Sequence, residues 1–239
     1  HDQDRACNLS TPRLKHRHSV HPFELPHIEH LYQAGYHRSK YSCMPSAYSQ
    51  KGPPLMIQKS VCVYCGSRPG DDPEYTTQAD ALGRALAQND WRLVYGAGDV
   101  GLMGTVARAA QAAGGTTFGV IPDHLVKWEV GKTDLTTYVV TETMHERKKV
   151  MFMNCDAMVV LPGGAGSLDE LFEVLTWRQL GLHQKPVILL NTNGYWDPLT
   201  ALLDHVVAHG FADESLLGYV DTVDDVDAAL EVLRRGLTA

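Results

Sequence analysis

The sequence predicts an α/β protein in which a doubly wound parallel sheet is covered by helices on both faces. Short runs rich in apolar and β-branched residues alternate with helical patterns from Met56 to the C-terminus. Continuous apolar runs are typical of strands buried on both faces, and strands that alternate with helices form parallel sheets. The chain has 239 residues, of which 44% are hydrophobic, so it is long enough for one sizeable core.

Strands and helices are expected to follow each other in order along this region. The strands are expected at residues 61–65, 92–95, 116–121, 137–140, 157–161, 187–191 and 219–223. The helices are expected at residues 74–88, 102–113, 144–154, 167–180, 198–209 and 226–235. The connection over residues 122–136 is irregular and holds Trp128, Glu129 and Lys132. Loops of this length in compact α/β units are usually functional or mobile.

Residues 1–55 show no sustained helical or strand period, and they are rich in histidine and proline. We expect a flexible extension, or sequence upstream of the natural start, because Met56 directly precedes the first strand. An organelle-targeting segment is one alternative. A metal site at His27 and His30 is another, but no cysteine or carboxylate cluster completes it. The folded domain is therefore expected over residues 56–239.

Composition excludes several classes of partner and location. A net charge of -7 argues against a general nucleic-acid binder, whose phosphate contacts need a basic face. No apolar run approaches the roughly 20 residues of a membrane span, so no membrane partner is expected. Five cysteines without a framework spacing predict a reducing compartment, which we take as cytoplasmic. Cys62 and Cys65 have redox-motif spacing, but an odd offset in a strand sends them to opposite faces, which favours buried strand residues.

A glycine-rich turn follows the predicted strand 157–161. It has the sequence LPGGAGSLDE from Leu161 to Glu170 and opens a predicted helix. Glycine lets the backbone approach an anion, and the N–H groups of a first helical turn point at it. Ser167 is expected at the N-cap, where its hydroxyl binds a helix N–H or a phosphate oxygen. Glu170 has the wrong charge for a phosphate site. Its structural alternative is a capping box, Ser-x-x-Glu.

Two more glycine turns follow strands, CGSRPG at residues 65–70 and YGAGDVGLMG at 95–104. Ligands of open parallel sheets bind outside the carboxyl ends of the strands, so the three turns are expected on one rim. The second turn fits a dinucleotide fingerprint poorly, because Asp123, the acidic residue at about the right distance, follows a strand-ending proline. For any one of these turns, close packing of a helix on a strand is a sufficient explanation of the glycines. The occurrence of three such turns on one rim favours a phosphate pocket.

A charged cluster, MHERKK, opens the predicted helix 144–154. Arg147 shares a helix face with Met144 and Met151, so its stem lies along an apolar stripe. An arginine in that position needs an anionic partner, and its planar fork fits a carboxylate such as Glu170 or a phosphate. A salt bridge with no catalytic role is the structural alternative. Lys148 and Lys149 are expected to extend from pocket to solvent.

Three of these motifs resemble those of a known family. The runs YGAGDVGLMG, MHERK and PGGAGSLDE, in this order from about Ser60 to the C-terminus, resemble the LOG ("Lonely guy") family. Its members are cytokinin riboside 5′-monophosphate phosphoribohydrolases, often mislabelled as lysine decarboxylases. The resemblance implies a Rossmann-like single domain, usually a homodimer with its active site near the subunit interface. It also implies hydrolysis of an adenine-type nucleoside 5′-monophosphate such as AMP to free base and ribose 5-phosphate, without cofactor or metal.

The resemblance also implies site residues. Arg147 and Glu170 would be the catalytic pair, and the run from Gly164 to Ser167 would hold the 5′-phosphate. The residues implied to bind substrate are Glu129, Lys148, Gly164, Ala165, Gly166, Ser167, Leu168, Asp169 and Thr176. Two positions depart from the family pattern. Ser167 replaces the usual threonine and keeps the hydroxyl, whereas Ala97 replaces a third glycine and removes backbone freedom at the second turn.

The chemistry explains why a carboxylate would stand beside a phosphate site. Breaking the bond between ribose and base builds positive charge on the sugar ring. Glu170 would stabilise that charge, bind ribose hydroxyls or orient the attacking water, and Arg147 would hold it ionised. The proton donor to the base is not assigned, and Glu129 is a candidate only by resemblance.

Two other functions compete with hydrolysis. A non-catalytic carrier or sensor of a phosphorylated ligand, resembling molybdenum-cofactor carriers, gains nothing from the carboxylate of Glu170. A pyridoxal-phosphate lysine decarboxylase needs a lysine that forms a Schiff base, and no lysine here has a suitable setting.

Overall fold

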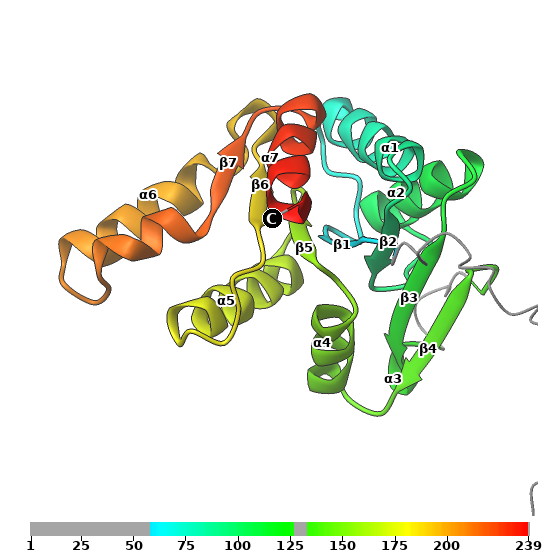
Figure 1. Cartoon of the computed structure of the whole chain (residues 1–239), viewed down its shortest axis with the longest axis horizontal. Coiled ribbons are helices and arrows are strands. Elements are labelled where there is room, and N and C mark those ends of the chain that lie inside the picture. The colour runs from blue at the N-terminus through cyan, green and yellow to red at the C-terminus, as the bar shows by residue number, and fades with distance from the viewer. Residues whose placement is uncertain (1–57, 127–132, 239) are drawn as a thin grey trace, which may run out of the picture. The chain divides into compact units, whose positions relative to one another are not determined.

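Parallel strands form the centre of the computed structural model, which describes residues 58–126 and 133–238. Within these ranges a 7-stranded sheet has the order β4-β3-β2-β1-β5-β6-β7, and all neighbours are parallel. The strands are β1 (Ser60–Tyr64), β2 (Arg92–Tyr95), β3 (Thr117–Pro122), β4 (Thr137–Thr141), β5 (Ala157–Val160), β6 (Val187–Leu190) and β7 (Asp221–Val223). The predicted fold class, a Rossmann-like doubly wound sheet, is therefore confirmed (Figure 1).

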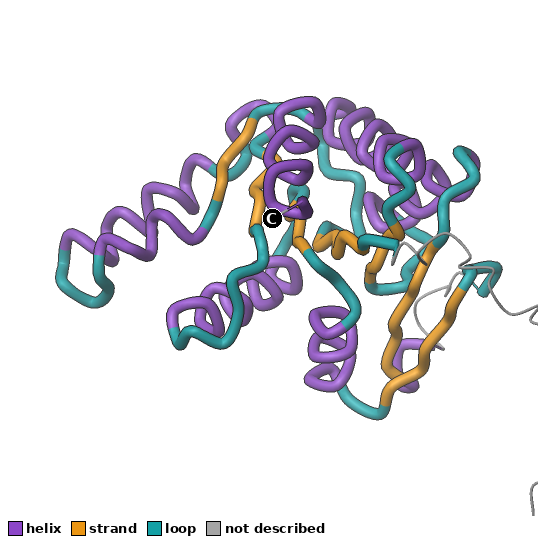
Figure 2. The backbone as a smooth tube through the Cα atoms, viewed as in Figure 1, coloured by secondary structure: helices purple, strands orange, loops and turns teal. Residues whose placement is uncertain are grey.

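Helices cover both faces of this sheet (Figures 1 and 2). One face packs against α1 (Pro73–Gln88), α2 (Gly101–Ala112) and α7 (Val226–Thr238). The other face packs against α4 (Met144–Met153), α5 (Ala165–Gln179) and the start of α6 (Asp197–Ala208). Three short elements complete the described chain: α3 (Asp123–Val126) and the 3-10 helices η1 (Thr192–Gly194) and η2 (Glu214–Tyr219). No helix among the described residues has the length and apolar character needed to cross a membrane.

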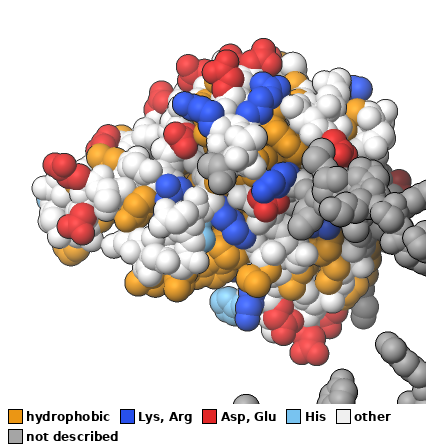
Figure 3. Space-filling view, in the orientation of Figure 1, with side chains coloured by type: hydrophobic (Ala, Val, Ile, Leu, Met, Phe, Trp, Pro, Cys, Tyr) orange, Lys and Arg blue, Asp and Glu red, His pale blue; other side chains and the backbone are white. Residues whose placement is uncertain are grey.

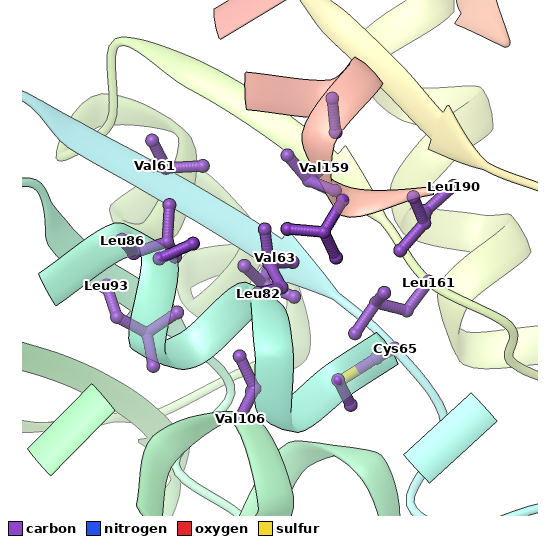
Figure 4. Close-up of a cluster of buried hydrophobic side chains, with 14 of the residues drawn as sticks. Val61, Val63, Cys65, Leu82, Leu86, Leu93, Val106, Val159, Leu161 and Leu190 are labelled. Atoms are coloured by element: carbon purple, nitrogen blue, oxygen red, sulfur yellow. The ribbon is translucent and has the colours of Figure 1, made fainter. Parts of the chain in front are cut away.

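The side chains of β1 divide between the two cores. Val61, Val63 and Cys65 lie in the core under α1, α2 and α7, where Figure 4 shows them facing the same cluster. Cys62 and Tyr64 lie in the opposite core, against α4 and α5. Every residue of β1 is buried, because the strand is central and both of its faces are covered. Cys62 and Cys65 are thus buried on opposite faces, as predicted, although Cys65 lies one residue past the end of β1, and both are free thiols.

The predicted boundaries hold to within two residues, except that α7 continues three residues past its predicted end, to Thr238. The last strand, expected at residues 219–223, begins at Asp221 because η2 extends to Tyr219. The irregular connection begins with the short helix α3, and Trp128, Glu129 and Lys132 then lie outside the described residues. The predicted extension over residues 1–55 also lies outside them, so it stays a prediction.

The strand order positions the functional site. The chain builds the sheet outward from β1 in one direction, then returns to β5 and builds outward in the other. The loops that follow β1 and β5 therefore diverge at the carboxyl edge and leave a crevice between them. At its base the N–H of Gly66 donates to the carbonyl of Pro162 over 3.0 Å. Two of the three glycine turns thus meet, as predicted.

Gly83 lets α1 and α2 pack closely. A Cβ at this position would meet the carbonyl oxygen of Val106 and would lie 2.9 Å from the Cβ of Ala109. We expect Gly83→Ala to lower the free energy of unfolding by about 1–3 kcal/mol, because the helix backbones must separate. This cost outweighs the better helix propensity of alanine.

Chemical denaturation measures this effect, with Gly218→Ala as the control. An added Cβ at Gly218 meets no atom within 4 Å, so its effect should stay below about 0.5 kcal/mol. Equal free energies of unfolding for the two variants would contradict this account of the α1–α2 contact.

Candidate functional site

A cavity of about 450 Å³ lies at the carboxyl edge of the sheet, between the loops that follow β1 and β5. Residues 65–71 and 162–167 form two of its walls, and Gly96 contributes from the turn after β2. Helix α4 contributes Met144, Arg147 and Met151. The cavity therefore lies where the strand order reverses, between β1 and β5, which is where open α/β sheets bind their ligands.

Helix α5 begins earlier than the sequence pattern indicates. Its N-cap is Gly164, and no side chain caps it. Ser167 lies inside the first turn and is only 4% exposed, so its prediction as the N-cap is wrong. A Cβ added to Gly163 would meet the Oγ of Ser167 and lie 2.7 Å from its Cβ, so the serine packs directly on the glycine backbone. The first intrahelical bond runs from the Leu168 N–H to the Gly164 carbonyl over 3.1 Å.

Because α5 starts earlier than predicted, a capping box cannot explain the presence of Glu170. A capping box needs the serine at the N-cap and the glutamate three residues later, and here Gly164 holds the cap. The capping box that does form lies on α4. There the Thr143 hydroxyl accepts from the Glu146 N–H at 3.2 Å, while the Glu146 carboxylate accepts from the Thr143 N–H at 3.2 Å. Glu170 is therefore not used as a cap.

Glu170 lines the cavity and is partly buried. Burial raises the pKa of its carboxyl to about 7, and the positive charge of Arg147 opposes this rise. The negative charges of Asp169 and Glu173 raise the pKa further, whereas Lys148 lowers it. A carboxyl with a pKa near neutrality exists in both protonation states at physiological pH.

Arg147 is 5% exposed and also lines the cavity. Its Nη2 donates to the carbonyl of Gly96 over 2.6 Å, and its Nε donates to the carbonyl of Val120 over 3.1 Å. The shared face with Met144 and Met151 is confirmed, but the polar partners are backbone carbonyls. Among the described ion pairs none joins Arg147 to Glu170.

Glycine is required where Arg147 approaches the turn after β2. A Cβ at Gly96 would meet the Nη2 of Arg147 and lie 3.0 Å from its Cζ. The next residue, Ala97, has a φ of 60°, in the left-handed region where glycine is favoured. The departure from the family pattern at Ala97 therefore falls at a position where an L side chain costs backbone energy.

Lys148 is buried and joins α4 to α5. Its Nζ binds the carboxylates of Asp169 and Glu173 at 2.9 and 3.3 Å. Burial by itself lowers the pKa of Lys148, but these two acidic partners outweigh it and the pKa stands above its ordinary value. Only Lys149 is exposed, so the expectation that both lysines extend to solvent is wrong for Lys148. Lys148 is not part of the cavity wall, and its contact with a ligand stays a prediction.

The other predicted binding residues divide into three groups. Gly164, Ala165, Gly166, Ser167 and Asp169 line the cavity. Leu168 packs toward the core under α4 and α5, and the Thr176 hydroxyl donates to the Phe172 carbonyl over 2.7 Å on α5. Glu129 lies outside the described residues.

Sequence reasoning missed the loop after β6. The Tyr195 hydroxyl donates to the carbonyl of Gly163 over 2.7 Å, and its ring contacts that of Tyr75 edge-on at 5.5 Å between centroids. Asn193, with a φ of 52°, donates through Nδ2 to the Asp72 carboxylate over 2.8 Å. These contacts tie the loop to both walls of the cavity. The Asn-Gly pair at Asn193 was the available signal, because it marks a tight turn.

Within the described ranges, no group of three or more His, Cys, Asp or Glu side chains could hold a metal ion.

Known proteins resemble this chain in sequence and in fold. Residues 103–233 match the family described as "Possible lysine decarboxylase". The cytokinin riboside 5′-monophosphate phosphoribohydrolase of Rhodococcoides fascians is 44% identical over 177 residues, which cover 74% of this chain and 89% of the relative. The protein of that name from Mycobacterium marinum is 42% identical over 177 residues, covering 74% and 94%.

A solved structure shares the fold at lower identity. The molybdenum cofactor carrier protein from Chlamydomonas reinhardtii aligns with a TM-score of 0.60 and 22% identity, covering 77% of this chain and 100% of that chain. Similarity at this level of identity concerns the fold alone.

The raised pKa of Glu170 makes stability depend on pH. Its ordinary value is 4.5, so between about pH 4.5 and 7 the folded chain keeps a proton that the unfolded chain has released. The folded state therefore loses stability as pH rises through this window, by at most about 3 kcal/mol. Glu170→Gln does not ionise. We expect this variant to exceed the native chain in unfolding free energy at pH 8 and to match it at pH 4.

Urea denaturation at pH 4, 6 and 8 measures the difference between the two chains. Glu231→Gln, on the exposed side of α7, is the matched control, and its difference from the native chain should not change with pH. If the Glu170→Gln difference were as constant as that of the control, burial would not be what sets this carboxyl's pKa.

Proposed function

Because the chain belongs to the LOG family of cytokinin riboside 5′-monophosphate phosphoribohydrolases, we propose that it hydrolyses the N-glycosidic bond of adenine-type nucleoside 5′-monophosphates. The products are the free base and ribose 5-phosphate. One structural observation supports the proposal independently of the chain's membership of this family. A single cavity contains both an uncapped helix N-terminus and the carboxyl of Glu170, which has no structural role as a cap. The free N–H groups of the helix N-terminus can bind the phosphate of a sugar phosphate, and the carboxyl can stabilise positive charge on its reacting sugar ring.

In this proposal the 5′-phosphate binds at the N-terminus of α5. The N–H groups of Ala165, Gly166 and Ser167 precede the first intrahelical bond, so no helix carbonyl accepts from them. A Cβ added to Gly164 or Gly166 would meet no atom within 4 Å, which leaves room for a ligand against the backbone. The helix dipole adds partial positive charge at this end. Binding here fixes the sugar relative to Glu170.

Glu170 acts on the sugar in this proposal. As the bond to the base breaks, positive charge develops on the ribose ring, and an ionised carboxylate beside the ring stabilises it. The same carboxylate can bind the ribose hydroxyls or orient the attacking water. Water adds its hydroxyl to C1′, and its proton balances the charge of the departing base. Binding energy from the distant phosphate contributes to orientation at C1′.

Arg147 is the second member of the proposed catalytic pair. Its charge lowers the pKa of Glu170 and so favours the ionised form, without an ion pair between the two side chains. Its bonds to Gly96 and Val120 hold the guanidinium at the cavity wall. Ligand contacts by the remaining predicted residues belong to the same proposal: Glu129, Lys148, Leu168, Asp169 and Thr176.

Base release tests the proposal. The purified chain is incubated with AMP and with N6-isopentenyl-AMP, and free base is measured by chromatography. We expect release from the native chain and a fall in kcat of roughly 10²-fold or more in Glu170→Gln, the range for loss of a charge-stabilising or acid–base group. Glu231→Gln again provides the control.

Two outcomes would redirect the assignment. Binding of AMP without any base release would favour the alternative, a carrier or sensor of a phosphorylated ligand. Release that persists unchanged in Glu170→Gln would refute the role of this carboxyl.

The proposed homodimer would use α4 and α5. These helices touch through Phe152 and Trp177, whose ring centroids are 4.7 Å apart. Figure 3 shows hydrophobic side chains gathered along the lower edge of this face, in the region of the two helices. The exposed apolar side chains of α4, α5 and the turn after α5 are Met153, Phe172, Leu180 and Leu182. An exposed apolar patch of this kind is typical of an interface.

Sedimentation analysis tests the dimer. We expect the native chain to sediment as a dimer and Met153→Asp to shift it toward monomer, because a charge would be buried without a partner. Met153 is 68% exposed in the single chain. Phe211→Asp is the control, since Phe211 is 87% exposed on the turn after α6. Equal association of both variants would place the interface elsewhere.

A cytoplasmic location completes the proposal. The cysteines of the described ranges, Cys62, Cys65 and Cys155, are buried free thiols. Free thiols suit a reducing compartment.

A further inference from the structure

The residues that line the cavity, as far as the chain is described, include two cationic ones, Arg147, which is buried, and Arg68, which is exposed. Arg147 already donates to the carbonyls of Gly96 and Val120. Lys148 is outside the wall and is held by two carboxylates of α5. The Arg68 side chain has neither a hydrogen bond nor an ion pair with any residue that the structure describes. Of these two lining residues, Arg68 is therefore the one whose guanidinium donors have no partner among the described residues.

The backbone that carries Arg68 is held between two elements of the site. On one side, the N–H of Gly66 donates to the Pro162 carbonyl over 3.0 Å, and a Cβ at Gly66 would lie 3.4 Å from the Cα of Gly163. On the other side, the Leu102 N–H donates to the Gly66 carbonyl over 3.1 Å. A Cβ at Gly101 would meet the backbone carbonyl carbon of Ser67 and the backbone nitrogen of Arg68, so only glycine fits there. Arg68 is therefore anchored beside the glycine turn that opens α5.

We infer that Arg68 binds the 5′-phosphate of the substrate opposite the amides of α5, and that it sets the preference for nucleoside monophosphates over nucleosides. This inference rests on the proposed function. A phosphate monoester carries nearly two negative charges at neutral pH, and the helix amides supply only partial positive charge. A planar guanidinium supplies a full charge and two parallel donors to phosphate oxygens.

The competing account is that Arg68 is an ordinary surface arginine. Asp71 lines the same part of the cavity, and a solvated pair between the two side chains would contribute little. The two accounts differ in what happens to a phosphorylated ligand when the charge is removed. Only the phosphate contact makes affinity depend on the presence of the phosphate group.

Binding of ribose 5-phosphate, AMP and adenosine to the full chain tests the inference by calorimetry. We expect Arg68→Ala to weaken binding of both phosphorylated ligands by roughly 10- to 100-fold, the range for a hydrogen bond to a charged group. Adenosine binding should not change, so the preference for AMP over adenosine falls by the same factor. Arg68→Lys keeps the charge but not the fork and should recover part of the affinity.

Arg84→Ala is the matched control, because Arg84 is an exposed arginine on α1 that pairs with Asp80 outside the cavity. It should bind all three ligands as the native chain does. The dependence of affinity on salt concentration is a second readout. Native affinity for ribose 5-phosphate should fall more steeply with ionic strength than that of Arg68→Ala, because a charge contact is screened. A merely structural role for Arg68 would not change this slope.

Each outcome bears on one claim. Native-like affinity of Arg68→Ala for ribose 5-phosphate, an equal loss for AMP and adenosine, or no binding of ribose 5-phosphate by the native chain would overturn the inference. Binding through Arg68 in a chain that releases no base would leave the inference standing and make the proposed hydrolysis wrong. Base release by the native chain, together with native-like binding by Arg68→Ala, would support the proposed hydrolysis and overturn the inference about Arg68.

Discussion

The hydrogen bond from the Gly66 N–H to the Pro162 carbonyl joins the two loops at which the sheet reverses its direction of growth. Parallel pairing of β1 with β5 brings the ends of these strands side by side, and the bond then fixes the loops that leave them. Arg68 lies on one loop and the glycine turn of α5 follows the other. Loss of this register would separate the cation from the helix amides while leaving both loops intact.

The charges at the cavity are arranged so that the carboxyl of Glu170 keeps no ion-pair partner among the described residues. Arg147 is satisfied by the carbonyls of Gly96 and Val120, and Lys148 is satisfied by Asp169 and Glu173. Burial then dominates over attraction and raises the pKa of Glu170 to about 7. A direct bond to Arg147 would have favoured the ionised carboxylate and occupied the oxygens that the proposed reaction uses. The carbonyl partners of Arg147 therefore leave Glu170 available.

The sequence predicted the elements better than it predicted the contacts. Alternating apolar runs are a local signal, and they located the strands to within a residue or two. The start of α5 was misplaced because Ser167-x-x-Glu170 reads as a cap, whereas glycine at the true N-cap is a weaker signal. The partners of Arg147 lie 27 and 51 residues away, and no pattern within a helix indicates backbone carbonyls at that distance. The role of Tyr195 was missed for the same reason, because Gly163 is 32 residues away.

A fold shared with a molybdenum cofactor carrier does not decide between carrying a phosphorylated ligand and cleaving it. Both functions need the glycine turn, and both would gain from Arg68. Glu170 separates them, because a carboxylate beside a bound dianion weakens binding through repulsion. Burial also makes the ionised form of this carboxyl unfavourable for the folded chain. The proposed hydrolysis gives this carboxyl a use that a carrier would lack, because positive charge would develop beside it on a ribose ring that is losing its base.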